Sequence, residues 1–88
     1  MDNDDRRQSE REFPRRTIAR IVLDGVPQEF QILDESEGGL GVYANDREQF
    51  QPNTLVSVAV EADETRTATV RYVFPHPNGG YQVGLKWV

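Results

Sequence analysis

The sequence predicts an all-β protein: a small six-stranded antiparallel β-barrel, closed or split along one seam, with a flexible N-terminal arm. Short segments rich in β-branched and aromatic residues follow one another closely, and several of them alternate apolar and polar residues. No ten-residue segment shows a helical period. Six short strands with one apolar face each, in a chain of 88 residues, hide both their faces and their edges by closing into a barrel.

The first three strands are expected in the N-terminal half of the chain. They are the segments TIARIVLD, QEFQILD and LGVYA, at residues 17–24, 28–34 and 40–44. β-Branched and aromatic side chains dominate each segment, and they pack well on a pleated, half-buried surface. The Gly-Val-Pro sequence between the first two segments marks a turn, because glycine and proline interrupt strands.

The last three strands are expected at residues 55–61, 66–74 and 81–88. Successive side chains of a strand point to opposite faces, so alternate residues share one face. This period predicts the following core-facing residues: Val56, Val58 and Val60; Ala68, Val70, Tyr72 and Phe74; Tyr81, Val83, Leu85 and Trp87. Thr67, Thr69 and Arg71 are expected to face water.

The connections carry local signals of their own. Residues 45–53, NDREQFQPN, are the longest connection and have room for a turn of helix. Residues 75–80, PHPNGG, predict a hairpin loop, because proline cannot continue a β-ladder and Asn-Gly-Gly accepts positive φ. Asp63 and Glu64 fit a solvated hairpin turn better than an acid–base pair.

Composition excludes several classes of function. A single domain of this length buries only about 60% of the surface exposed by its unfolded chain, so we expect a shallow site. The chain has no cysteine and one histidine, His76, between two prolines, so we expect neither a metal site nor a catalytic residue. No apolar segment is long enough to span a membrane, and we expect a soluble, cytoplasmic protein without membrane insertion.

The net charge of −5 conceals an uneven distribution. Residues 6–20 hold six arginines and two glutamates, whereas the rest of the chain is acidic. A nucleic-acid-binding surface spreads its basic residues over one face, so a single basic arm indicates a local anion site instead. Arginine suits such a site, because its planar group binds phosphate through two donors and stacks on flat rings.

A second unusual segment is ILDESEGGLGV, residues 32–42. Asp34 is expected to end a strand, and Asp34 and Ser36 can accept backbone N–H groups and fix a turn. Gly38 and Gly39 permit left-handed backbone angles and leave N–H groups uncovered, an arrangement that can bind an anion or admit a flat base. The pattern alone is equally compatible with an ordinary hairpin turn.

Taken together, the two segments resemble the PilZ domain, a bacterial receptor for cyclic di-GMP. The resemblance rests on R-x-x-x-R at Arg11 and Arg15, on D-x-S-x-x-G from Asp34 to Gly39, and on the terminal strand GGYQVGLKWV. It implies that Arg11 and Arg15 bind phosphate and guanine, and that Asp34, Ser36 and Gly39 contact a guanine base. Arg16 and Gly38 are further candidates for the same site.

The register of the arginine motif is a choice. R-x-x-x-R also occurs from Arg7 to Arg11 and from Arg16 to Arg20. We take Arg11 and Arg15 because Phe-Pro-Arg then leads straight into the first strand, as in the family. We expect residues 1–10 to form an acidic and polar disordered tail, and residues 11–88 to form the PilZ-like domain including the arm.

The resemblance implies a non-enzymatic receptor that needs no cofactor and no nucleic acid. In this hypothesis the arm closes over cyclic di-GMP on the barrel surface, and the change is relayed to an unidentified protein partner. One alternative is a PilZ-like protein–protein adaptor that has lost nucleotide binding, since Glu35 and Glu37 would repel a ligand with two phosphates. Another is a barrel of the OB type that binds single-stranded nucleic acid, which requires exposed aromatic residues on a basic groove.

Overall fold

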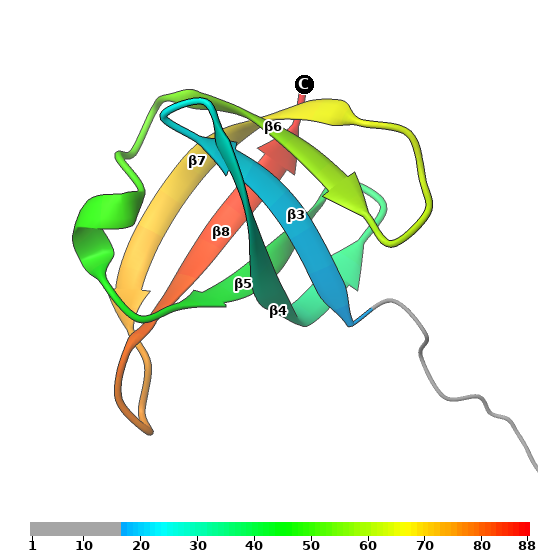
Figure 1. Ribbon diagram of the computed structural model, residues 1–88. Helices are drawn as coiled ribbons and strands as arrows, with labels where there is room; N and C mark the ends of the chain where they lie inside the picture. Colours follow the sequence, from blue (N-terminus) through cyan, green and yellow to red (C-terminus); the bar gives the residue numbers. More distant parts are fainter. Residues whose placement is uncertain (1–16) are drawn as a thin grey trace, which may run out of the picture.

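The computed structural model describes residues 17–88, which form one closed antiparallel barrel (Figure 1). Its elements are β3 (Ile18–Leu23), β4 (Val26–Ser36), β5 (Gly39–Ala44), the 3-10 helix η1 (Arg47–Gln49), β6 (Leu55–Val60), β7 (Arg66–Pro75) and β8 (Tyr81–Trp87). The strand order is β3-β4-β5-β8-β7-β6, and β6 pairs back with β3. The predicted fold class is therefore confirmed. The expected tail and arm, at residues 1–16, lie outside the described residues.

The core is the inside of the barrel, and it is wholly apolar among the residues described. Alternation places one face of each strand inside, as the period-two pattern predicts for β6 and β8. Trp87 is half-buried against this core, and the guanidinium of Arg66 lies 4.2 Å from the centre of its ring. The buried residues are Ala19, Ile21, Phe30, Leu40, Val42, Ala44, Phe50, Val58, Val60, Ala68, Val70, Val83 and Leu85.

A β-bulge in β7 overturns the prediction that Tyr72 and Phe74 face the core. Val70 pairs with Leu85, but Tyr72 pairs with Gly84, so Arg71 is an extra residue in the ladder. An extra residue inverts the alternation beyond it. Tyr72 and Phe74 therefore face outward, 38% and 53% exposed, and their rings stack with centres 4.6 Å apart.

A second bulge, in β4, decides where Asp34 points. Ile32 pairs with Val42 and Asp34 pairs with Gly41, so Leu33 is the extra residue. In a regular strand Asp34 would share the core-facing side with Ile32. The bulge turns it to the outside, where its carboxylate lies over Gly41, a residue between two core residues of β5. Asp34 also does not end the strand as expected, because β4 continues to Ser36.

Two connections agree with their sequence signals, but the predicted Gly-Val-Pro turn does not, because β4 already begins at Val26 and includes Pro27. η1 is the turn of helix expected in residues 45–53, and the Asp46 side chain caps it by accepting the backbone N–H of Glu48 at 2.9 Å. The β7–β8 hairpin closes through Gly79 and Gly80, whose φ angles are +97° and +72°. Both hairpin glycines adopt the left-handed conformation that the sequence predicts.

Candidate ligand-binding site

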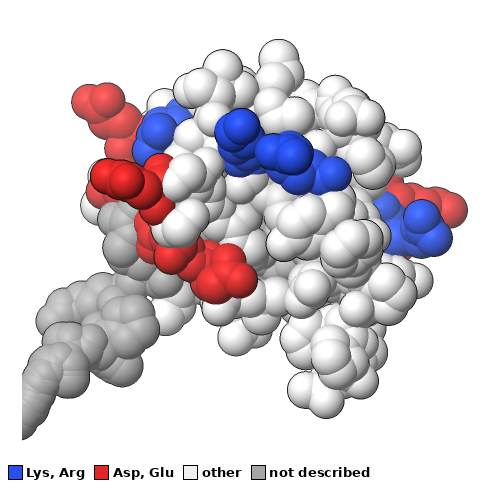
Figure 2. Space-filling view, turned by 180° about the vertical axis from the view of Figure 1, so that it is seen from behind, with Lys and Arg blue, Asp and Glu red and all other residues white. Residues whose placement is uncertain are grey.

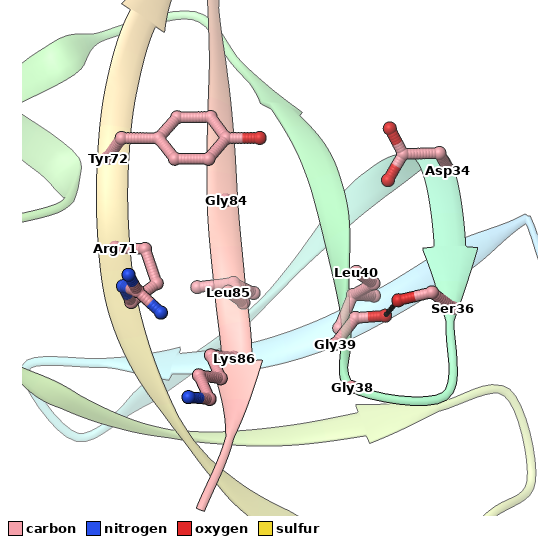
Figure 3. A pocket seen from close by; sticks show the side chains of 10 residues that line it. All are labelled: Asp34, Ser36, Gly38, Gly39, Leu40, Arg71, Tyr72, Gly84, Leu85 and Lys86. Atoms are coloured by element: carbon pink, nitrogen blue, oxygen red, sulfur yellow. Dashed lines mark hydrogen bonds between the residues drawn. The ribbon is translucent and has the colours of Figure 1, made fainter.

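A pocket of about 400 Å³ lies on the outer surface of the barrel (Figure 3). Strands β4, β5, β7 and β8 and the β4–β5 turn contribute to it. The pocket brings together the predicted site residues that the structure describes, while Arg11, Arg15 and Arg16 lie outside the described residues. Its lining is Asp34, Ser36, Gly38, Gly39, Leu40, Arg71, Tyr72, Gly84, Leu85 and Lys86.

Buried glycines lie beneath the side chains that surround this pocket. Gly39, Gly41 and Gly84 are buried, although they lie on the outward face of β5 and β8, because neighbouring groups cover them. A Cβ at Gly84 would collide with the ring of Tyr72, and a Cβ at Gly39 would collide with the backbone carbonyl of Leu85. Tyr72 therefore lies across β8, with its hydroxyl directed toward the side where Asp34 stands (Figure 3).

The β4–β5 turn differs in backbone conformation from the one expected. The Ser36 hydroxyl donates to the carbonyl of Gly39 at 3.5 Å, a long bond that leaves the hydroxyl able to rotate toward a ligand. Neither Gly38 nor Gly39 has a positive φ, so the expectation of left-handed backbone angles at these two glycines was wrong. The carbonyl of Gly38 instead accepts the N–H of Trp87 at 2.8 Å, which ties the turn to β8.

Sequence reasoning did not assign Arg71, Tyr72 and Lys86 to the site, although their side chains line the pocket. Arg71 and Lys86 place two cations on the side opposite Asp34 (Figure 3). The polar positions in TVRYV and GLKWV predict that both face outward, but they do not tell which strand neighbours the D-x-S turn. On the face seen in Figure 2, basic side chains form a ridge that is separate from a group of acidic ones. The site therefore has a cationic side and an anionic side.

Arg20 belongs to another part of the surface. It faces outward from β3 and forms an exposed ion pair with Glu29, at 3.6 Å. Both residues line a separate cavity of about 240 Å³, together with Ile18, Ala59 and Glu61. Arg20 does not line the pocket that contains Asp34. If the arginine motif were Arg16 to Arg20, one of its two arginines would therefore lie away from the site.

His76 has a local structural role. Its Nδ1 accepts the backbone N–H of Asn78 at 3.1 Å, and its ring packs edge-on against Tyr43 with centres 5.6 Å apart. Within residues 17–88, no three His, Cys, Asp or Glu side chains come close enough to hold a metal ion. The same part of the chain has no helix of the length and apolar character needed to cross a bilayer.

Substituting Gly39 with alanine is expected to destabilise the barrel by about 1–3 kcal/mol, because the added methyl forces β5 away from β8. Gly38→Ala is the matched control, since a Cβ at Gly38 meets no atom within 4 Å. Urea denaturation of the two variants measures the difference. Equal stability of both would contradict the close approach of Gly39 to Leu85.

Comparison with known proteins agrees with this geometry. The PilZ domain model matches residues 5–88, nearly the whole chain. No curated protein and no solved structure gave a match. PilZ domains are typically receptors without catalytic activity. The all-β barrel, its D-x-S turn and the family match together show that this chain belongs to the PilZ domain family, a family of cyclic di-GMP receptor domains.

Proposed function

We propose that this protein is a non-enzymatic, cytoplasmic receptor for cyclic di-GMP, whose N-terminal arginines close over the ligand on the outside of the barrel. The observation that carries the proposal is the pocket, where the exposed carboxylate of Asp34 stands opposite Arg71 and Lys86. A cyclic dinucleotide carries both kinds of group that these side chains bind: guanine N–H donors and anionic phosphates.

Asp34 is suited to the Watson–Crick edge of guanine. That edge presents the N1–H and N2–H donors, and a carboxylate accepts two hydrogen bonds side by side. The adjacent Hoogsteen edge presents the O6 and N7 acceptors, which the planar group of arginine binds as a pair. We assign this second edge to the arm, through Arg11 and Arg15, with Arg16 as a further candidate. On the side of the turn, the base is bordered by Ser36 and Gly39, with Gly38 as a further candidate.

The other side chains that line the pocket suit the phosphates and the aromatic bases of the ligand. Arg71 and Lys86 supply positive charge for the phosphates, and charge-assisted hydrogen bonds to phosphate are among the strong ones. Tyr72 offers an aromatic surface at the same pocket, and stacking on aromatic rings tolerates any base. Recognition of guanine in particular thus depends on Asp34 and the arginines of the arm.

The start of β3 lies beside β4, the strand that holds Asp34. The carbonyl of Thr17 accepts the N–H of Ile32 at 2.8 Å, so the chain is antiparallel to β4 from its first described residue. Ile32 lies two positions before Asp34 in β4, so the first described residue of the chain lies near the part of β4 that leads to the pocket. Arg15 and Arg16 directly precede Thr17.

Closure of the arm gives the ligand a means of signalling. A ligand shifts a conformational equilibrium when it contacts one state more strongly than the other. Arginines that contact cyclic di-GMP only in the closed state provide this difference. A protein partner that binds the closed arm then reads the concentration of the nucleotide.

Isothermal titration calorimetry tests the receptor function, with linear pGpG and GTP as controls at moderate salt. We expect saturable binding of cyclic di-GMP in the micromolar range or tighter, and weaker binding of both controls. Absence of heat at high ligand concentration would reject the receptor and favour the adaptor alternative, in which the acidic Glu35 and Glu37 beside the turn prevent nucleotide binding.

A further inference from the structure

A groove with an apolar lining lies at the end of the barrel where β3 turns into β4. It is a cavity of about 410 Å³ between the β3–β4 hairpin, η1 and the start of β6. Three of its lining residues belong to the core or pack against it: Phe50 is buried, and Leu23 and Val56 are partly buried. The groove therefore leads from the surface to the side of the hydrophobic core.

Two exposed apolar side chains extend this lining outward. Leu55 and Val22 line the groove and are 66% and 37% exposed. The alternation of β6 and β3 turns both outward, because the neighbouring Val56 and Ile21 face the inside. A single exposed leucine is ordinary, but apolar side chains gathered on a groove are typical of an interaction surface.

Two carboxylates also line the groove, and rigid backbone holds each of them. Asp24 and Gly25 form the two-residue turn between β3 and β4, with φ angles of +53° and +78°. Asp-Gly is favoured in such hairpin turns, because both positions require positive φ. Glu48 belongs to η1, which the Asp46 side chain caps. The two acidic groups are therefore in place before any partner arrives.

Neither carboxylate is neutralised within residues 17–88. Asp24 and Glu48 have no ion pair there, and their carboxylate oxygens accept no hydrogen bond. They are also the only charged side chains that line the groove in this part of the chain. An apolar lining beside unpaired negative charge complements an apolar side chain flanked by lysine or arginine, and charge complementarity of this kind selects one partner over others.

We propose that this groove is a docking site for a basic segment of a protein partner. An apolar side chain of the segment packs on Val22 and Leu55, and flanking lysine or arginine side chains pair with Asp24 and Glu48. The inference goes beyond cyclic di-GMP, since the groove shares no lining residue with the nucleotide pocket. The two sites lie at opposite ends of β4, so both can be occupied at once (Figure 1).

An NMR titration of the ¹⁵N-labelled protein tests this site with a short capped peptide of alternating lysine and leucine. We expect its shifts to gather at the amides of Val22, Asp24, Glu48 and Leu55. Two control peptides separate the contributions: alternating glutamate and leucine reverses the charge, and alternating lysine and serine removes the apolar anchor. Both controls are expected to bind more weakly, and added salt is expected to weaken the lysine–leucine peptide.

Substitutions in the groove test the same contacts from the side of the protein. Leu55→Ser is expected to weaken the peptide about tenfold, because its side chain becomes buried only in the complex. Leu33→Ser is the matched control, since Leu33 is also exposed but does not line the groove. Asp24→Asn and Glu48→Gln are each expected to weaken binding roughly two- to fivefold, and Glu64→Gln, outside the groove, not at all.

The outcomes that overturn the proposal are distinct from a failure of the nucleotide receptor. Shifts that avoid the groove, equal binding of the glutamate–leucine peptide, or equal effects of Leu55→Ser and Leu33→Ser would each contradict the docking site. Shifts of the groove amides when the protein alone is concentrated would identify a second copy as the occupant and overturn the basic segment. Titration with cyclic di-GMP is a separate measurement, so either site can fail while the other stands.

Discussion

Replacing Asp34 with asparagine is expected to weaken binding of cyclic di-GMP by roughly one to two orders of magnitude, without lowering the melting temperature of the barrel. Asparagine has the same shape, so it still covers Gly41. It offers one acceptor where the carboxylate offers two, and it turns an N–H₂ donor toward the donors of guanine. The loss therefore falls on recognition of the base and not on packing.

Calorimetry on this variant needs a control for the change in charge alone. Glu37→Gln removes one acidic group from the same turn, and Glu37 does not line the pocket. We expect this control to bind as tightly as the wild type or slightly more tightly, because a negative charge near a ligand with two phosphates is removed. Equal losses in the two variants would show that Asp34 does not contact the nucleotide.

Arg15→Ala is expected to weaken binding by a similar amount, roughly one to two orders of magnitude, because one charge-assisted hydrogen bond contributes about 1.5–3 kcal/mol. Arg15 lies two positions before Thr17, the first residue that the structure describes. We expect thermal denaturation to be unchanged, because the substitution leaves every core residue described above in place.

Two control variants decide the register of the arginine motif. Arg7→Ala is expected to bind normally if Arg11 and Arg15 form the R-x-x-x-R pair. Arg20→Ala is also expected to bind normally, because Arg20 lines the separate cavity that it shares with Glu29. A loss in Arg7→Ala as large as that in Arg15→Ala would contradict the chosen register, and an equal loss in all three would contradict a specific role for the arm.

Much of the fold could be predicted because it depends on local signals. β-Branched segments with period two mark strands β6 and β8, and proline with two glycines marks the β7–β8 hairpin. The number of strands and the small size of the chain then favour closure, because an open sheet would leave edges exposed. The core follows from the same alternation wherever the ladder is regular, as at Val58, Val60 and Val83.

The bulges could not be predicted in the same way. A bulge adds one residue to one strand, and the register that reveals it belongs to the pairing of two strands. No sequence signal at Leu33 or Arg71 predicts that these residues are the extra ones in the ladder. Both bulges nevertheless shape the site: the first turns Asp34 outward, and the second turns Tyr72 outward onto Gly84.

The cationic side of the pocket depends on topology. β8 lies between β5 and β7, so Lys86 and Arg71 come next to the D-x-S turn although they are 35 or more residues later in the chain. Chain order alone does not define which strands are neighbours in a barrel. The motif identifies Asp34 and Ser36, whereas only the structure identifies the groups that face them.

The measurement that tests the central claim most directly is an NMR titration of the ¹⁵N-labelled protein with cyclic di-GMP. We expect the largest shifts at the amides of Asp34, Ser36, Gly39, Arg71, Tyr72 and Lys86 and at those of the arginine arm, with little change at Arg20 and Glu29 on the other cavity. Shifts that avoid the pocket, or no shifts at saturating ligand, would contradict the account.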